Sequence, residues 1–253
     1  MQKRGKIKKL IQNFKPGTIL LSGWLEQMGI SRSLRQEYIK NGWLVPVGRG
    51  AYKRFHDEVE WFAGVNALQK QAGRQVHIGA LTALDLMGVS HYLRSRNNVF
   101  LFSPYGVHLP SWFRHANWHQ EIIHKQSSFL TYDIGIIEYE NRYNNLLISS
   151  PERAIMECLY LTPENIDTVE CYHLMEGLVN LQPDLVKELL KNCHSIKVKR
   201  LFLYMAEKAN HQWLQFIDIS DIDLGSGNRR IARNGQYHGK YQLTLPIELI
   251  NFK

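Results

Sequence analysis

The stretch Leu20–Phe55 constrains the fold more than any other part of this sequence. A short amphipathic helix is predicted over residues 20–28, and Gly29 marks the turn that ends it. Ser31 is a suitable N-cap for a second helix, and Gly42 stands where a left-handed residue would end that helix. Two short helices joined by a tight turn are therefore expected.

Two strand-like runs follow the second helix, Trp43–Val47 and Ala51–Phe55. The turn Gly48–Gly50 joins them, and its two glycines supply the positive φ angles that a tight hairpin needs. Pro46 cannot donate a ladder hydrogen bond, which places its strand at a sheet edge. With a further amphipathic helix predicted over residues 3–14, this order of elements predicts a winged helix-turn-helix.

The second helix is predicted to present polar side chains on the side opposite Leu34 and Tyr38. Arg and Gln can pair with guanine and adenine in a major groove, while Lys and Ser can hold phosphates. Taken alone, this pattern also fits an ordinary amphipathic helix, and the hairpin beside it favours DNA binding. The residues predicted to contact DNA, from this helix and the hairpin, are Arg32, Ser33, Arg35, Gln36, Lys40, Arg49, Lys53 and Arg54.

The distribution of charge separates this region from the rest of the chain. Residues 1–56 contain twelve basic and two acidic residues, a net charge of +10. The other residues contain 19 basic and 21 acidic residues, a net charge of −2. A basic excess confined to one small module indicates a nucleic-acid binder rather than a membrane-surface helix.

Residues 57–253 are predicted to form a second, mixed domain, beside a first domain over residues 1–56. Helices are expected over 57–72, 78–87, 151–161, 164–179, 183–192 and 197–208, and strands over 98–103, 134–138, 146–148 and 241–245. The clearest helix start is Ser150, followed by Pro151 at the first helical position. Because helices and strands do not alternate regularly, the predicted class is α+β.

No convincing active site is found in the sequence. His115, His119 and His124 lack an acid or cysteine in a recognised metal-binding frame. The segment Leu224–Arg230 is glycine-rich and basic but lacks phosphate-loop spacing, so it is expected to be a loop. The sequence therefore predicts a protein that is not an enzyme and needs neither metal nor cofactor.

Asp184, Glu188 and Lys191 resemble a nuclease triplet, but their spacing is wrong. The three cysteines form neither a disulfide framework nor a zinc pattern. No window approaches the roughly 18 apolar residues of a membrane span. A cytoplasmic location without membrane contact is therefore expected.

Several motifs along the chain resemble those of the AbiEi-family antitoxins, which belong to bacterial abortive-infection systems of toxin–antitoxin type IV. The matching segments are Gly29–Ser31, Gly42–Leu44, Gly48–Tyr52, Ile148–Ala154, Lys197–Tyr204, Ile222–Gly227 and Lys240–Pro246. The winged half is shared by many regulators, whereas the segments around Ser150 and Gly225 are more distinctive.

The resemblance implies a winged-helix repressor that binds inverted repeats in its own promoter. It also implies a C-terminal domain that neutralises a nucleotidyltransferase-like toxin, without requiring a stable complex with it. Basic residues in the matching C-terminal segments are candidates for this antitoxic role: Arg153, Lys197, Lys199, Arg200, Arg229 and Arg230. Two alternatives stay open, a nucleic-acid-modifying enzyme with a winged targeting module, and a plain regulator whose second domain senses an effector or dimerises.

Overall fold

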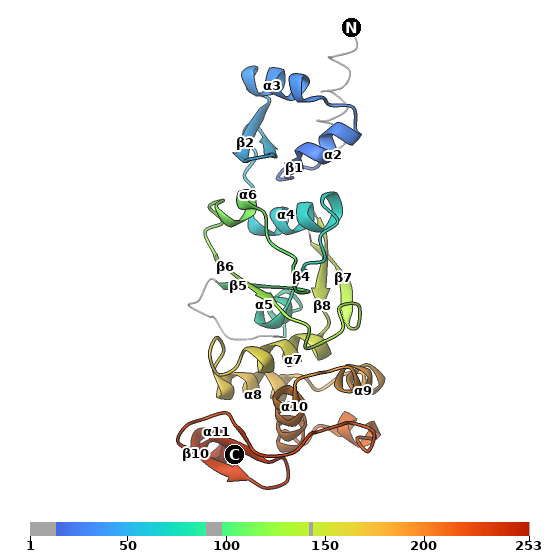
Figure 1. Cartoon of the computed structure of the whole chain (residues 1–253), viewed down its shortest axis with the longest axis vertical. Helices are drawn as coiled ribbons and strands as arrows, with labels where there is room; N and C mark the ends of the chain where they lie inside the picture. The colour runs from blue at the N-terminus through green and yellow to red at the C-terminus, as the bar shows by residue number, and fades with distance from the viewer. Residues whose placement is uncertain (1–13, 90–97, 142–143, 253) are drawn as a thin grey trace. The chain divides into compact units, whose positions relative to one another are not determined.

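The computed structural model describes residues 14–89, 98–141 and 144–252 (Figure 1). Its helices and three sheets make the chain α+β, which confirms the predicted class. The chain divides into two compact units. The first comprises Met1–His77, Arg96–Gln126 and Glu138–Leu147, and the second comprises Ile78–Ser95, Ser127–Ile137 and Ile148–Lys253. The domain boundary after residue 56, which the charge distribution predicts, stays a prediction.

The first unit contains the predicted winged helix-turn-helix (Figure 1). Its helices are α2 (Ser22–Gln27) and α3 (Arg32–Lys40). Its sheet has the order β1–β3–β2, formed by Leu20–Leu21, Ala51–Arg54 and Leu44–Gly48. The helix expected from residue 20 thus begins two residues later, because β1 precedes it. The helix expected over residues 3–14 lies outside the described residues, apart from its last residue.

Local signals in the sequence explain where α3 begins and ends. The Ser31 hydroxyl accepts a hydrogen bond from the backbone N–H of Leu34 at 3.3 Å, and so caps the helix. Gly42 follows the helix with a φ of 69°, a conformation that glycine adopts without strain. The inner face of α3 packs into a small apolar core of Leu20, Leu25, Ile30, Leu34, Tyr38 and Leu44. The opposite face of α3 is thereby left toward solvent.

The winged hairpin is antiparallel and irregular on one strand. Val45 of β2 lies opposite Lys53 of β3, and the register shifts between Pro46 and Gly48. Such a bulge bends its strand and increases the local twist. On the other side of β3, Leu20 of β1 completes the sheet.

Two helical segments follow the winged module in the first unit. The helix expected over residues 57–72 is α4 (Trp61–Asn66), which continues directly into the π-helical segment η1 (Ala67–Gln71). The buried Gln69 side chain of η1 donates to the carbonyls of Val76 and Leu147, at 2.9 and 3.0 Å, and accepts from the N–H of Leu147 at 2.9 Å. One amide side chain therefore satisfies backbone groups beside η1.

A five-stranded sheet has the order β6–β5–β4–β8–β7 (Figure 1). In that order, its strands are Glu121–Gln126, Asn98–Ser103, His77–Ile78, Asn144–Ser149 and Ile136–Asn141. β5 and β6 are parallel, with Val99 opposite Ile122. β6 is not among the strands predicted from the sequence, and its side chains are at most partly buried. The short helix α6 (Ser111–Arg114) lies between β5 and β6 in the chain.

The second unit is mainly helical. Its longer helices are α5 (Ala80–Leu86), α7 (Pro151–Leu161), α8 (Thr168–Gly177), α9 (Pro183–Lys191) and α10 (Ile196–Lys208). α7 is almost wholly buried and contacts the other four. Its start is as predicted, because the Ser150 hydroxyl caps it and Pro151 opens it.

A small sheet of order β10–β11–β9 and the helix α11 (Ile247–Asn251) complete the second unit. Its strands are Gly235–His238, Leu243–Pro246 and Arg229–Arg230. The tail strand predicted over residues 241–245 corresponds to β11. Among the described residues, no helix combines the length and the apolar character needed to cross a membrane.

Candidate nucleic-acid interface

The exposed face of α3 carries four of the residues predicted to contact DNA, namely Arg32, Ser33, Gln36 and Lys40. The Arg32 guanidinium and the Lys40 ammonium lie at the two ends of this face, and the Gln36 amide lies near its middle. These groups can donate hydrogen bonds to phosphates and to base edges. Ser31 and Ser33 hydroxyls lie 2.9 Å apart at the start of the helix. The arrangement suits a helix that enters a major groove with its N-terminal half.

Arg49 occupies the turn of the winged hairpin, between Gly48 and Gly50, and its side chain is exposed. Gly50 has a φ of 82°, which only glycine adopts readily and which allows the turn to be tight. A cation at a narrow tip can reach a phosphate or a minor groove beside the groove that holds the helix.

Arg35, which was also predicted to contact DNA, does not lie on the exposed face of α3. Its side chain is 5% exposed, and its guanidinium points into the helix-turn-helix. One guanidinium nitrogen donates to the carbonyls of Ile30 and Ser22, at 3.1 and 3.4 Å, and the other to the carboxylate of Glu26 at 2.7 Å. Arg35 therefore fastens α3 to α2 and to the turn between them.

Lys53 and Arg54 are also engaged within the protein. Lys53 Nζ donates to the backbone carbonyl of Asp57 at 2.8 Å, and Arg54 Nε donates to the Asp57 carboxylate at 3.0 Å. The same carboxylate accepts from the backbone N–H of Gly17 at 3.0 Å. Asp57, which the sequence reading did not single out, thus ties the end of the hairpin to the segment before β1. These contacts leave Arg49 as the outward-directed cation among the three predicted hairpin residues.

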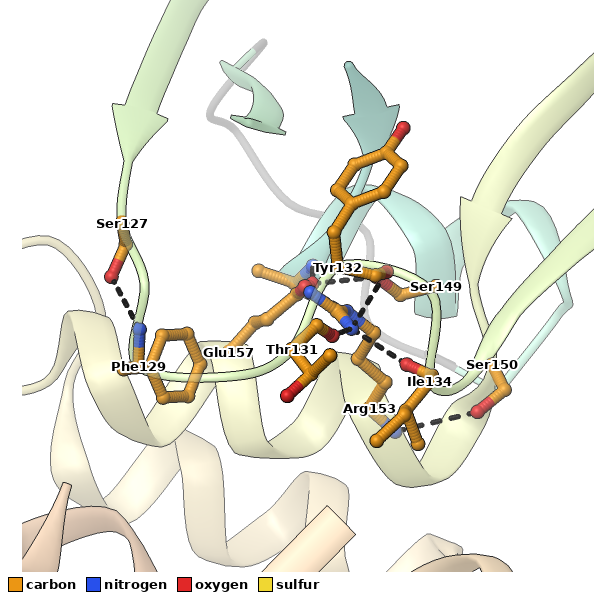
Figure 2. A network of polar contacts seen from close by, with 10 residues as sticks. Ser127, Phe129, Thr131, Tyr132, Ile134, Ser149, Ser150, Arg153 and Glu157 are labelled. Atoms are coloured by element: carbon orange, nitrogen blue, oxygen red, sulfur yellow. Dashed lines mark hydrogen bonds and ion pairs between the residues drawn. The ribbon is translucent and has the colours of Figure 1, made fainter. Parts of the chain in front are cut away.

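Arg153 lies in a buried polar network rather than on a surface (Figure 2). Its Nη1 donates to the carbonyls of Thr131, Tyr132 and Ile134, at 2.7, 3.2 and 2.6 Å. Its Nε donates to Glu157 at 2.9 Å, and the two side chains are 4% and 0% exposed. Arg153 therefore builds the interior of the second unit, and its part in antitoxicity stays a prediction.

The second carboxylate oxygen of Glu157 extends this network. It accepts from the Ser149 hydroxyl at 2.7 Å and from the backbone N–H of Ala80 at 2.9 Å (Figure 2). Ala80 has a φ of 47°, an unusual conformation for a residue with a side chain. α7 therefore uses Arg153 and Glu157 to hold the 131–134 loop, the end of β8 and the start of α5 together.

Arg200 of α10 has a similar structural role, because it binds the backbone of the distinctive segment around Gly225. Its guanidinium donates to the carbonyls of Leu224, Gly225 and Gly227, at 2.7, 2.9 and 2.6 Å, and to that of Gln242 at 3.2 Å. Burial lowers the pKa of Arg200, and the neighbouring Arg229 lowers it further. The carbonyls of the glycine-rich loop thus accept hydrogen bonds from the buried Arg200 guanidinium.

The other basic candidates divide between the interior and the surface. Lys197 Nζ donates to the carbonyls of Tyr160 and Thr162, at 2.9 and 2.6 Å. Lys199 is 4% exposed. Arg229 is half-buried and Arg230 is exposed, both on β9. Arg230 is thus exposed and Arg229 half-buried, whereas Arg200 and Lys199 are buried, and the role of all four in antitoxicity stays a prediction.

The three histidines do not come together into a metal site. His115 and His119 are exposed, whereas His124 is partly buried with its Nε2 2.8 Å from the Ser103 hydroxyl. In the described part of the chain, no group of three or more His, Cys, Asp or Glu side chains is placed to hold a metal ion. Cys158, Cys171 and Cys193 are buried and are not joined by disulfides.

An exposed helix rich in hydrogen-bond donors, beside a hairpin with a cation at its tip, defines a winged-helix DNA-binding regulator. Two family descriptions match the sequence. Residues 3–95 match "Transcriptional regulator, AbiEi antitoxin N-terminal domain", and residues 96–246 match "Transcriptional regulator, AbiEi antitoxin, Type IV TA system". The chain therefore belongs to the AbiEi antitoxin family of type IV toxin–antitoxin systems, as the motifs predict.

The fold also resembles a solved structure, that of the RV2827C protein from Mycobacterium tuberculosis. The two chains superpose with a TM-score of 0.64 over 99% of this chain and 93% of the other, at 12% sequence identity. At that identity the likeness shows a shared fold alone. None of the curated proteins compared with this sequence matches it.

Proposed function

We propose that this antitoxin binds the promoter of its own operon and represses it, with α3 in the major groove and Arg49 on the adjacent backbone or minor groove. The exposed set Arg32, Ser33, Gln36 and Lys40 carries this proposal. Its chemistry is that of base and phosphate recognition, and the +10 charge of residues 1–56 adds long-range attraction to DNA. Inverted repeats in the promoter would bind two copies of the chain.

Promoter binding is tested with the purified full chain and a fluorescent duplex from upstream of its gene, followed by anisotropy over a range of salt concentrations. The logarithm of the association constant should fall linearly with the logarithm of the salt concentration, with a slope of roughly −0.9 for each phosphate neutralised. A scrambled duplex should bind more weakly. Equal affinity for the two duplexes, or no binding at low salt, would reject the proposal.

The second part of the proposal concerns neutralisation of a nucleotidyltransferase-like toxin in the bacterial cytoplasm. Arg229 and Arg230 are the candidates for this activity, because Arg153, Lys199 and Arg200 are buried and Lys197 is bound to backbone carbonyls. Direct contact with the toxin is not required by the proposal. The family is one of transcriptional regulators, which gives no support to the alternative of a nucleic-acid-modifying enzyme.

Neutralisation is tested by co-expressing the chain with the toxin of the neighbouring gene and measuring cell growth. Wild type should protect, Arg229→Ala with Arg230→Ala should protect less, and Arg32→Ala with Gln36→Ala should protect fully. Full protection by the first double variant would exclude Arg229 and Arg230. Loss of protection in the second would contradict the separation of DNA binding from antitoxicity.

A further inference from the structure

The winged hairpin lies directly on α6. A Cβ atom added at Gly48, the last residue of β2, would come within 2.8 Å of Cβ and 2.9 Å of Cα of Trp112. The φ of Gly48 is not in the positive region, so the backbone there would accept any residue. The close approach to α6, and not the conformation of the turn, is therefore what requires a glycine at this position.

α6 is itself held firmly within the first unit. Phe113 is fully buried, and Phe113 and Trp118 lie 2.8 and 2.9 Å from the position that a Cβ atom would take at Gly64 of α4. Trp118 Nε1 donates to the backbone carbonyl of Phe113 at 2.7 Å. The surface on which the hairpin rests is thus a packed aromatic cluster on α4.

The opposite edge of the winged sheet is also held. In the order β1–β3–β2, the edge strands are β1 and β2. Gln71, the last residue of η1, accepts from the backbone N–H of Leu21 at 2.8 Å and donates to the carbonyl of Ile19 at 2.6 Å. One side-chain amide therefore pairs with the backbone at β1 as a neighbouring strand would. Residues that follow the winged module restrain both of its sheet edges.

We propose that α6, through its contact with Gly48, positions the wing for DNA binding, and that Gln71 supports this from the other edge. This inference rests on the DNA binding proposed above. Arg49 directly follows Gly48, and the bulge before Gly48 bends β2 at the contact. If the turn that carries Arg49 already has a fixed position relative to α3, binding DNA does not cost the conformational entropy of ordering a mobile hairpin. The DNA-binding unit thus extends through α6 and does not end with the wing.

The test compares two glycine-to-alanine variants of the full chain. Gly48→Ala inserts a methyl group against α6, whereas Gly23→Ala adds one in α2, where no atom lies within 4 Å. Each is measured by anisotropy with the promoter duplex over a range of salt. We expect Gly48→Ala to bind roughly tenfold more weakly because the Arg49 charged contact is lost, with a salt slope reduced by about one. Gly23→Ala should have the affinity and the salt slope of wild type.

A double-mutant cycle with Arg49→Ala distinguishes positioning from a general loss of folding. Arg49→Ala should weaken binding by wild type but have little further effect on Gly48→Ala. The dependence of the affinity on salt serves as the second readout, because an inactive fraction of the protein raises the apparent Kd by the same factor at every salt concentration and leaves the slope unchanged. Gln71→Ala removes the support of β1 without any steric overlap. It should weaken binding and reduce the salt slope, as Gly48→Ala does.

The outcomes separate this inference from the proposal on which it rests. A wild-type chain that binds no promoter DNA would overturn both. A wild-type chain that binds, with Gly48→Ala equal to it in affinity and slope, would overturn the positioning role alone. Strictly additive effects of Gly48→Ala and Arg49→Ala would do the same.

Discussion

Arg153 Nε lies 2.9 Å from Glu157 Oε1 in a pair whose side chains are 4% and 0% exposed. Removing one member of such a buried pair leaves the other charge without compensation, at a cost of about 3–5 kcal/mol. We therefore expect Arg153→Ala to lower the free energy of unfolding by about that amount in urea denaturation. Arg230→Ala, an exposed matched control, should change it by no more than about 0.5 kcal/mol.

The Arg153→Ala variant also decides what Arg153 does for antitoxicity. If Arg153 acts only as scaffold, protection from the toxin should fall in proportion to the amount of folded protein. An Arg153→Ala chain with wild-type stability and no protective activity would show that this residue acts directly.

A second prediction contrasts two arginines of α3. Arg35→Ala removes three internal hydrogen bonds of a charged group and should destabilise the winged module by roughly 2–3 kcal/mol. Arg32→Ala should leave stability unchanged and weaken promoter binding. Hydrogen exchange of the α2 and α3 amides, measured beside DNA affinity, separates the two effects. Equal exchange in both variants would contradict the structural role of Arg35.

A third prediction concerns pH. Burial, and then the neighbouring His108, lowers the pKa of His124 from its ordinary 6.5 to about 4. Between these values the unfolded chain takes up a proton that the folded chain does not. The stability contributed by neutral His124 is therefore complete above about pH 6.5 and is lost as the pH falls toward 4.

The thermal unfolding midpoint of wild type should accordingly fall more between pH 7 and pH 5 than that of His124→Gln. Glutamine is polar like histidine but has no proton to gain in this range. A fall of the same size in both proteins would show that His124 titrates normally in the folded state.

A fourth prediction concerns the thiols. Burial raises the pKa of Cys193 to about 11 and also raises that of Cys171. The folded protein should thus react slowly with a thiol reagent at pH 7.5, and all three thiols should react at once in denaturant. A thiol that reacts rapidly in the folded protein would indicate local opening of the structure around it.

Local signals made several elements predictable from the sequence. Ser31 and Ser150 cap α3 and α7 as expected, because a hydroxyl before a helix has backbone N–H groups within reach whatever the tertiary fold. The turn of the wing was predictable from its two glycines, and the buried strand β5 from its run of apolar residues. Strand β6 was not, because its mixed polar and apolar residues do not alternate clearly.

The location of the basic side chains was less predictable. Arg35 was predicted to contact DNA, and Arg153 and Arg200 were candidates for antitoxicity. The burial of their side chains was not predicted, since arginine is rarely buried unless paired. Each is buried because backbone carbonyls converge on its guanidinium, from the preceding helix and turn for Arg35 and from more distant segments for Arg153 and Arg200. No sequence pattern reports that convergence. The motif around Ser150 is therefore informative about the family, although its arginine builds the interior.

The most direct test of the account is the ratio of affinities for the promoter duplex and a scrambled duplex, compared between wild type and Gln36→Ala. A base-reading side chain contributes about 1–3 kcal/mol of discrimination, so the ratio should fall by roughly 5- to 150-fold in the variant while scrambled binding stays constant. A ratio of one in wild type, or an unchanged ratio in the variant, would contradict recognition of the promoter by α3.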